Sequence, residues 1–173
     1  MKILFLLMFL ILLSIAFAEN LTTLSELSFK DKVFFSPDVA FLWNFQRGFE
    51  ELYRFTKFSY LMRIDYSLEL CERRIGEMEV LISKNKSQII PVVENEYEME
   101  IDKIQFNMNS TDIFSKFIGP IDIDIKENVT QRLNYNIKVL DNISKNTSQQ
   151  EKAYLLNAIK KTSNLIDFIN KLR

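Results

Sequence analysis

The most regular pattern in this sequence is a series of apolar residues between positions 61 and 82, at alternating steps of three and four. The series is Leu61, Ile64, Leu68, Cys71, Ile75, Met78 and Ile82. This spacing predicts a long helix with one apolar seam, of the kind found in helical bundles and coiled coils. Ser59 stands where an N-cap is expected, and polar residues 83–88 are expected to end the helix.

The segments on either side carry helical signals of their own. Ser36, Pro37 and Asp38 have the character of an N-cap, a first-turn proline and a first-turn acid. The helix that they start is expected to bury Leu42, Phe45, Phe49 and Leu52. Another helix is predicted from near Pro91, with an inward face made of Val93, Tyr97, Ile101, Ile104 and Met108.

The last third of the chain predicts two more helices. Residues 109–120 read as a long connection, with a short helical turn at 113–117 at most. The alternation of residues 121–125 fits either a lone strand or the start of a fourth helix, and we prefer the helix because a lone strand would have no partner. That helix is expected to run to about Ser144 and to bury Val129, Leu133, Ile137 and Leu140. Ser148 is expected to cap a fifth, with an apolar face of Leu155, Ile159, Thr162, Ile166 and Ile169.

These segments predict an all-α fold, a bundle of four to five mostly antiparallel helices in a single domain over residues 36–173. Residues 19–35 read as a lead-in. Residues 1–18 combine Lys2, an apolar run and the small-x-small sequence Ala16-Phe17-Ala18, which predicts a signal peptide cleaved before Glu19. An uncleaved membrane anchor is the alternative. In either case we expect a secreted or envelope-attached protein.

The composition argues against several classes of function. The chain has no histidine, which is the usual general base and the commonest transition-metal ligand, so no catalytic residue, metal or cofactor is predicted. A formal net charge of −1 gives no nucleic-acid footprint. Cys71 is the single cysteine and is expected to be a small buried residue; a reactive thiol or an intermolecular bridge is the alternative.

Six aromatic residues crowd the first predicted helix: Phe41, Trp43, Phe45, Phe49, Tyr53 and Phe55. They spread over more than one face, which is typical of a helix covered on most sides. We therefore expect them to be core, with Val33, Phe34 and Phe35 of the lead-in able to fold back over them. The alternative is an exposed patch that grips a protein partner or the membrane surface.

Charged residues form two further patterns. The acidic run at residues 94–102 places Glu94, Glu98 and Asp102 on one line of a helix and Glu96 and Glu100 on another. We expect a solvated face, or one that pairs with the basic residues that prevail after position 126, rather than a cation site. Glu69, Arg73 and Glu77 are four residues apart and are expected to form successive ion pairs.

Asn-x-Ser/Thr sequons occur at six positions: Asn20, Asn85, Asn109, Asn128, Asn142 and Asn146. Behind an export signal each is a glycan acceptor candidate and implies an exposed position.

Several of these residues carry a resemblance to a known family. The stretches are Ser36-Pro37-Asp38, Phe41 to Trp43, Phe49-Glu50, Phe55-Thr56, Leu68 to Arg74, and Glu77. They resemble exported helical proteins of archaea and bacteria catalogued as a domain of unknown function, in which an aromatic helix precedes a helix with an E-x-R-[LI]-x-E signature. Asn136 to Leu140, and Leu155, Ala158 and Thr162, match its later patterns in part, but Asn136 stands where the family often has His and Ser148 where it often has Pro. The resemblance implies an extracytoplasmic helical fold. It supplies no activity, because none is established for the family.

The sequence therefore predicts an exported, non-enzymatic domain that binds a protein partner in the envelope or outside the cell. Attachment to a membrane surface is one alternative, and a small extracytoplasmic hydrolase or metal-binding protein is another.

Overall fold

The fold is all-α, as predicted. The computed structural model describes residues 27–118 and 123–172, apart from the side chains of 111–123. These residues form α2 (Ala40–Phe55), α3 (Tyr60–Ser83), α4 (Ile90–Ile118), α5 (Ile123–Ser144) and α6 (Gln149–Lys171), with the short 3₁₀ turns η1 (Lys30–Lys32) and η2 (Ser87–Ile89). No strand occurs among them. The proposed signal peptide lies outside the described residues.

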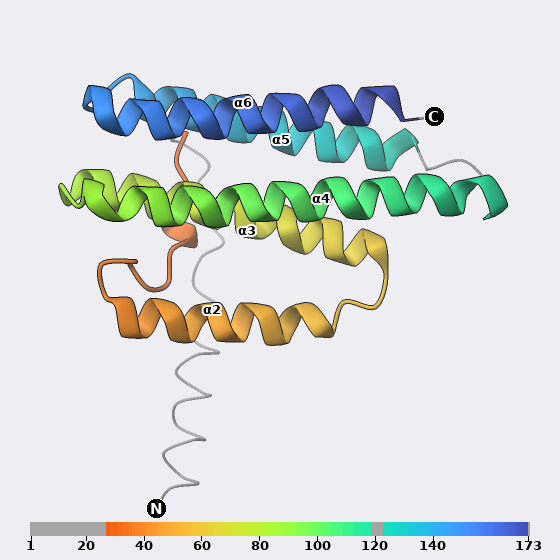
Figure 1. Ribbon diagram of the computed structural model, residues 1–173, viewed down its shortest axis with the longest axis horizontal. Helices are drawn as coiled ribbons and strands as arrows, with labels where there is room; N and C mark the ends of the chain where they lie inside the picture. The colour runs from red at the N-terminus through yellow and green to blue at the C-terminus, as the bar shows by residue number, and fades with distance from the viewer. Residues whose placement is uncertain (1–26, 119–122, 173) are drawn as a thin grey trace, which may run out of the picture.

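Four of the helices form a bundle of two antiparallel hairpins, and the fifth lies on its outside (Figure 1). The hairpins α3–α4 and α5–α6 pack together, with α4 against α6 and α3 against α5. Helix α2 lies on the side of α3 and α4 that faces away from α5 and α6 (Figure 1). Within the described part of the chain, no helix combines the length and apolar character needed to cross a membrane.

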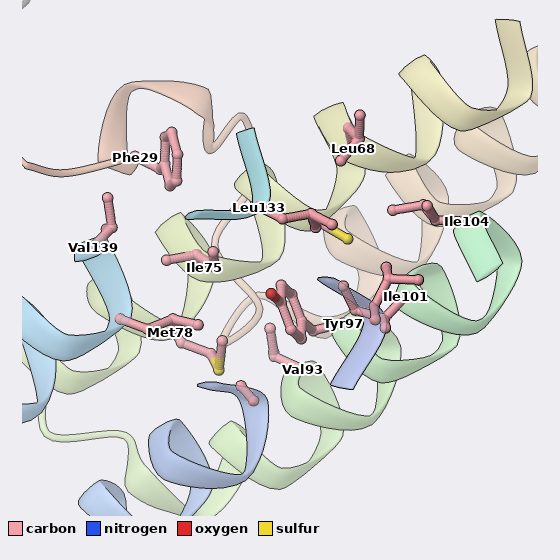
Figure 2. Close-up of a cluster of buried hydrophobic side chains, with 14 of the residues drawn as sticks. Phe29, Leu68, Ile75, Met78, Val93, Tyr97, Ile101, Ile104, Leu133 and Val139 are labelled. Atoms are coloured by element: carbon pink, nitrogen blue, oxygen red, sulfur yellow. The ribbon is translucent and has the colours of Figure 1, made fainter. Parts of the chain in front are cut away.

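The core of the bundle is built from the predicted seams. Figure 2 shows Ile75 of α3, Tyr97 of α4 and Leu133 of α5 directed into the same space, and all three are fully buried. The Tyr97 hydroxyl forms a hydrogen bond with Thr162 Oγ1 of α6 at 2.5 Å. The seam of α3 is therefore used inside the chain, and only its first residue, Leu61, is exposed.

Helices α3 and α6 begin directly after the N-cap residues that the sequence predicted, Ser59 and Ser148. Ser59 Oγ accepts a hydrogen bond from Met62 N at 3.2 Å. Ser148 and Glu151 form a reciprocal capping box at the start of α6. Asn85, in the left-handed region with φ 55°, reverses the chain after α3.

The start of α2 differs from the prediction. Val39 N donates to Ser36 O at 2.9 Å, so Ser36 to Val39 form a turn with Pro37 at its second position, and the helix begins only at Ala40. Lys84 Nζ donates to Ser36 Oγ and to Asp38 Oδ1, each at 3.1 Å, which ties this turn to the end of α3.

The predicted connection at 109–120 was also wrong, because α4 continues to Ile118. Its polar residues were read as loop formers, but Ser110 Oγ donates to the carbonyl oxygen of Phe106, four residues earlier, at 2.9 Å. In α5 and α6, Ile137, Ile159 and Ile166 are only half-buried, and Val139, Ala158 and Leu165 are buried instead.

The end of the lead-in packs on the bundle. Phe29 is buried and meets Tyr135 of α5 edge to face at 5.5 Å. Ser28 Oγ donates to Glu79 Oε2 of α3 at 2.7 Å. A side chain at Gly76 would clash with the Phe29 carbonyl oxygen, so the close approach of the lead-in requires glycine at this position.

Candidate functional site

Helix α2 turns most of its aromatic residues outward. Its buried residues are Trp43, Gln46 and Glu50. Of the six aromatic residues, Trp43 alone has the predicted core role. The other five are exposed, from 40% for Phe45 to 80% for Phe41, with Phe49, Tyr53 and Phe55 between these values. Leu42 and Leu52, expected to be buried, are exposed as well. The inward side of α2 is instead occupied by charged and amide groups that have partners on α3 and α4.

Glu50 is the centre of those contacts. Its carboxylate accepts hydrogen bonds from Arg73 Nη1 at 2.7 Å, Gln46 Nε2 at 2.9 Å and Arg47 Nη1 at 3.2 Å, and also from Arg74 Nη2. Burial alone would raise the pKa of Glu50, but the Arg74 and Arg73 guanidinium groups outweigh it and hold the pKa below its ordinary value. Glu50 is therefore a structural anion whose lone pairs are already used.

Arg74 joins Glu50 to Glu77 in the interior. Arg74 and Glu77 are fully buried, and Arg74 Nη1 donates to Glu77 Oε1 at 2.5 Å. Burial would lower the pKa of Arg74, but Glu77 and Glu50 outweigh it and raise the pKa. For Glu77, burial outweighs Arg74 and raises the pKa. Arg73, Arg74 and Glu77 of the E-x-R-I-x-E stretch are thus part of the attachment of α2 to α3. Glu72 instead pairs with Lys32 of the lead-in and Arg132 of α5.

The second half of α2 is attached to α4 in the same way. Arg54 donates to both oxygens of Glu100, at 2.7 and 2.8 Å, and to Ser67 Oγ of α3 at 2.9 Å. Arg47 pairs with Glu96. From the same acidic run, Asp102 pairs with Lys161 of α6 at 2.7 Å. The pair of Asp102 with Lys161 agrees with the expected pairing to basic residues after position 126, whereas the pairs with Arg47 and Arg54 of α2 were not expected.

The predicted ladder within α3 does not form as expected. Arg73 pairs with Glu50 of α2, and Glu77 pairs with Arg74, the next residue along the helix from Arg73. Glu69 is left without a hydrogen bond or ion pair to any residue that the structure describes. Partial burial and the neighbouring Asp65 carboxylate raise the pKa of Glu69.

A groove with aromatic walls lies between the lead-in, α2 and α3. We call it the aromatic groove; its volume is about 400 Å³, and it is lined by Phe34, Phe35, Phe45, Gln46, Phe49, Glu50, Tyr53, Tyr66, Glu69 and Arg73. Phe45 and Phe49 meet edge to face at 4.7 Å, and Tyr53 and Tyr66 at 5.2 Å. The lead-in does lie beside the aromatic residues of α2 as expected, but it forms one wall of a groove and leaves them open.

Sequence reasoning missed the inward charges of α2. Gln46 and Arg47 precede Glu50 by four and three residues, and Arg54 follows it by four, which is the signal that could have found them. It was passed over because the aromatic residues were assumed to define the buried side.

Cys71 is fully buried in the core, as expected. Burial raises its pKa well above the ordinary value, so its thiol is a poor nucleophile in the folded protein. Asn136 of α5 is also fully buried. Among the described residues, no cluster of carboxylates and thiols has the make-up of a metal site.

Five of the six sequon asparagines lie in the described residues, and all five are exposed: Asn85, Asn109, Asn128, Asn142 and Asn146. Asn109 lies on α4, not in a loop, and Asn142 Nδ2 donates to Leu27 O at 3.5 Å. Asn20 is outside the described residues. Glycosylation of these positions stays a prediction.

Comparison with known proteins gives one match. The model of a family described as a domain of unknown function, DUF5667, matches residues 35–152. This range includes α2, the charged contacts beneath it and every residue of the aromatic groove except Phe34. No curated protein and no solved structure matches the chain.

Proposed function

We propose that this chain, which belongs to the DUF5667 family, is an exported binding domain that acts without catalysis, by presenting the outer side of α2 to a protein partner. The observation that carries the proposal is the exposed aromatic surface of that helix. We call it the aromatic face and define it as Phe41, Phe45, Phe49, Leu52 and Phe55 of α2 together with Phe58, which follows the helix.

The aromatic face is large for a surface that stays in water. An aromatic side chain offers about 150–250 Å², so the exposed parts of these residues present on the order of 700 Å². The largest apolar patch of a typical monomer is about 300–600 Å². A partner that covered the face would remove a large apolar area from water, which is the main favourable term in protein association.

A protein partner fits this face better than a lipid surface does. Helices that lie on anionic membranes carry lysine and arginine beside their apolar side. In α2, Arg47 and Arg54 are used in ion pairs with Glu96 and Glu100, which leaves little positive charge to attract lipid. Co-sedimentation with vesicles containing anionic lipid is the direct check, and stable binding would favour the membrane alternative.

The non-enzymatic part of the proposal is supported by the state of the buried charges. Glu50, Glu77 and Glu100 are each bound to a guanidinium group, and the chain has no histidine to act as a base. These groups are arranged to hold α2 in place.

Export is the part that rests on residues 1–18. Purification of the native protein followed by intact-mass measurement tests it, and we expect a chain that begins at Glu19. Additional mass in hexose and N-acetylhexosamine steps would establish glycans on the exposed sequons. An unmodified chain that retains Met1 would contradict both predictions.

The binding role is tested by a matched pair of substitutions. Phe49 on α2 is 49% exposed, and Leu156 on α6 is 48% exposed. Phe49→Ala is expected to abolish the complex that is isolated by crosslinking the native protein, with a loss of stability of about 1 kcal/mol or less. Leu156→Ala should leave the complex intact.

The same pair identifies the result that contradicts the proposal. If Phe49→Ala cost about 3–5 kcal/mol, as for a core phenylalanine, the residue would be structural. If both variants kept the complex, the aromatic face would not be the binding surface.

A further inference from the structure

The aromatic groove holds a carboxylate that the fold itself does not use. Gln46, Glu50 and Arg73 line it, but Gln46 and Arg73 both donate hydrogen bonds to the Glu50 carboxylate. Glu69 also lines the groove and has no hydrogen bond or ion pair with a described residue, although Lys32 and Arg132 both pair with Glu72, one turn away. With Arg73 paired to Glu50, Glu69 is the charged residue of the groove lining that has no ion-pair partner among the described residues; Arg132 and Lys32 attract it without forming an ion pair.

We propose that the aromatic groove binds an apolar, basic segment of the partner and seats one of its cationic side chains between Glu69 and the aromatic rings. This inference rests on the proposed function and specifies the partner's chemistry. The ring faces attract a cation as well as offering apolar contact. A lysine suits such a site because its aliphatic stem can lie on the rings while its ammonium group reaches the carboxylate.

The charges around the groove argue against an acidic segment of the partner. An acidic segment would meet Glu69, whose pKa is raised by burial first and then by the carboxylates of Asp65 and Glu72, while Arg132 and Lys32 act in the opposite direction. Arg73 would not attract it strongly, because its guanidinium group is bonded to Glu50 and lies over the Phe34 ring at 4.9 Å. A bound cation would relieve the unfavourable field at Glu69.

Continuity with the aromatic face favours a segment over a free amine. Phe45 and Phe49 belong both to the groove and to the aromatic face. Apolar residues that flank the seated cation in a partner would therefore lie along α2, whereas a small amine would use the groove alone.

The test uses three labelled amphipathic peptides of equal length, with leucine on one side and lysine, glutamine or glutamate on the other. Their binding to the full chain is measured by fluorescence anisotropy at about 0.15 M salt, where the Debye length is about 8 Å. We expect the lysine peptide to bind best and the glutamate peptide at least tenfold more weakly. Glu69→Gln should weaken the lysine peptide by about three- to tenfold and leave the glutamine peptide unchanged.

Glu127→Gln is the matched control, since Glu127 is an exposed acid of α5 and the change in net charge is the same. If it weakened the lysine peptide as much as Glu69→Gln did, the effect would be general electrostatics and the cation site would be overturned. If butylamine bound as tightly as the lysine peptide, a segment would not be the ligand.

Phe49→Ala separates this inference from the proposed function. If it weakens both the lysine and the glutamine peptides while Glu69→Gln has no effect, the aromatic face binds partners but the cation site is wrong. If Phe49→Ala changes neither peptide, the proposed function fails as well. Circular dichroism of each variant checks that it is folded.

Discussion

Arg74 is fully buried and connects two carboxylates from different helices, so its removal should be costly. It bonds Glu50 of α2 and Glu77 of α3. Arg74→Ala would leave both carboxylates buried without their main partner, and we expect a loss of about 3–5 kcal/mol in unfolding free energy. Urea unfolding measures it, with the exposed Lys138→Ala as the control. A loss below about 1 kcal/mol would show that water replaces the guanidinium group.

The carboxylate of Glu50 predicts a pH dependence. Because its pKa in the folded protein is lowered below its ordinary value of 4.5, it binds fewer protons in the folded state than in the unfolded state. Its contribution is therefore fully present above pH 4.5 and is lost as the pH falls through the folded pKa. The stability difference between the native protein and Glu50→Gln should shrink on acidification below pH 4.5. A difference that grew there would reverse the sign of the shift.

At the scale of single elements, two glycines that lie in described helices can be compared directly. In α3, a side chain at Gly76 would meet the Phe29 backbone, whereas Gly48 of α2 has nothing within 4 Å of an added Cβ. We expect Gly76→Ala to destabilise by about 1–3 kcal/mol through displacement of the lead-in. Gly48→Ala should stabilise by about 0.5–1 kcal/mol, because alanine favours helix. Equal effects in urea unfolding would contradict the close approach at Phe29.

The elements also show what local sequence could predict. Helices α3 and α6 were recognised with their caps because the seam from Ile64 to Met78 and the Ser148 cap are local signals. The side of α2 that is buried was not predicted, because it depends on contacts such as Arg74 to Glu50, which are 24 residues apart. Apolar periodicity normally predicts the buried side of a helix. In α2, the apolar side is exposed instead, at 40% for Phe45 and more for Phe49 and Leu52. Glu69 was expected to pair with Arg73, but Arg73 pairs with Glu50 of α2.

At the scale of the whole molecule, α2 is attached by a different kind of contact from the other helices. The bundle of α3 to α6 shares one apolar core, to which α2 contributes Trp43 alone. The remaining attachment is mainly ionic, and buried ion pairs contribute little net stability because their desolvation offsets much of their attraction. Helix α2 should therefore open at a lower free energy than the bundle.

Trp43 makes this opening measurable, because it is the single tryptophan of the chain and lies buried on α2. Its fluorescence reports α2, whereas helical circular dichroism reports mainly the four bundle helices. In urea we expect the fluorescence transition to come at a lower midpoint than the dichroism transition. Gly48→Ala should raise the fluorescence midpoint more than the dichroism midpoint. Coincident transitions in both proteins would instead make α2 part of one cooperative unit with the bundle, and the aromatic face would then be as rigid as the core beneath it.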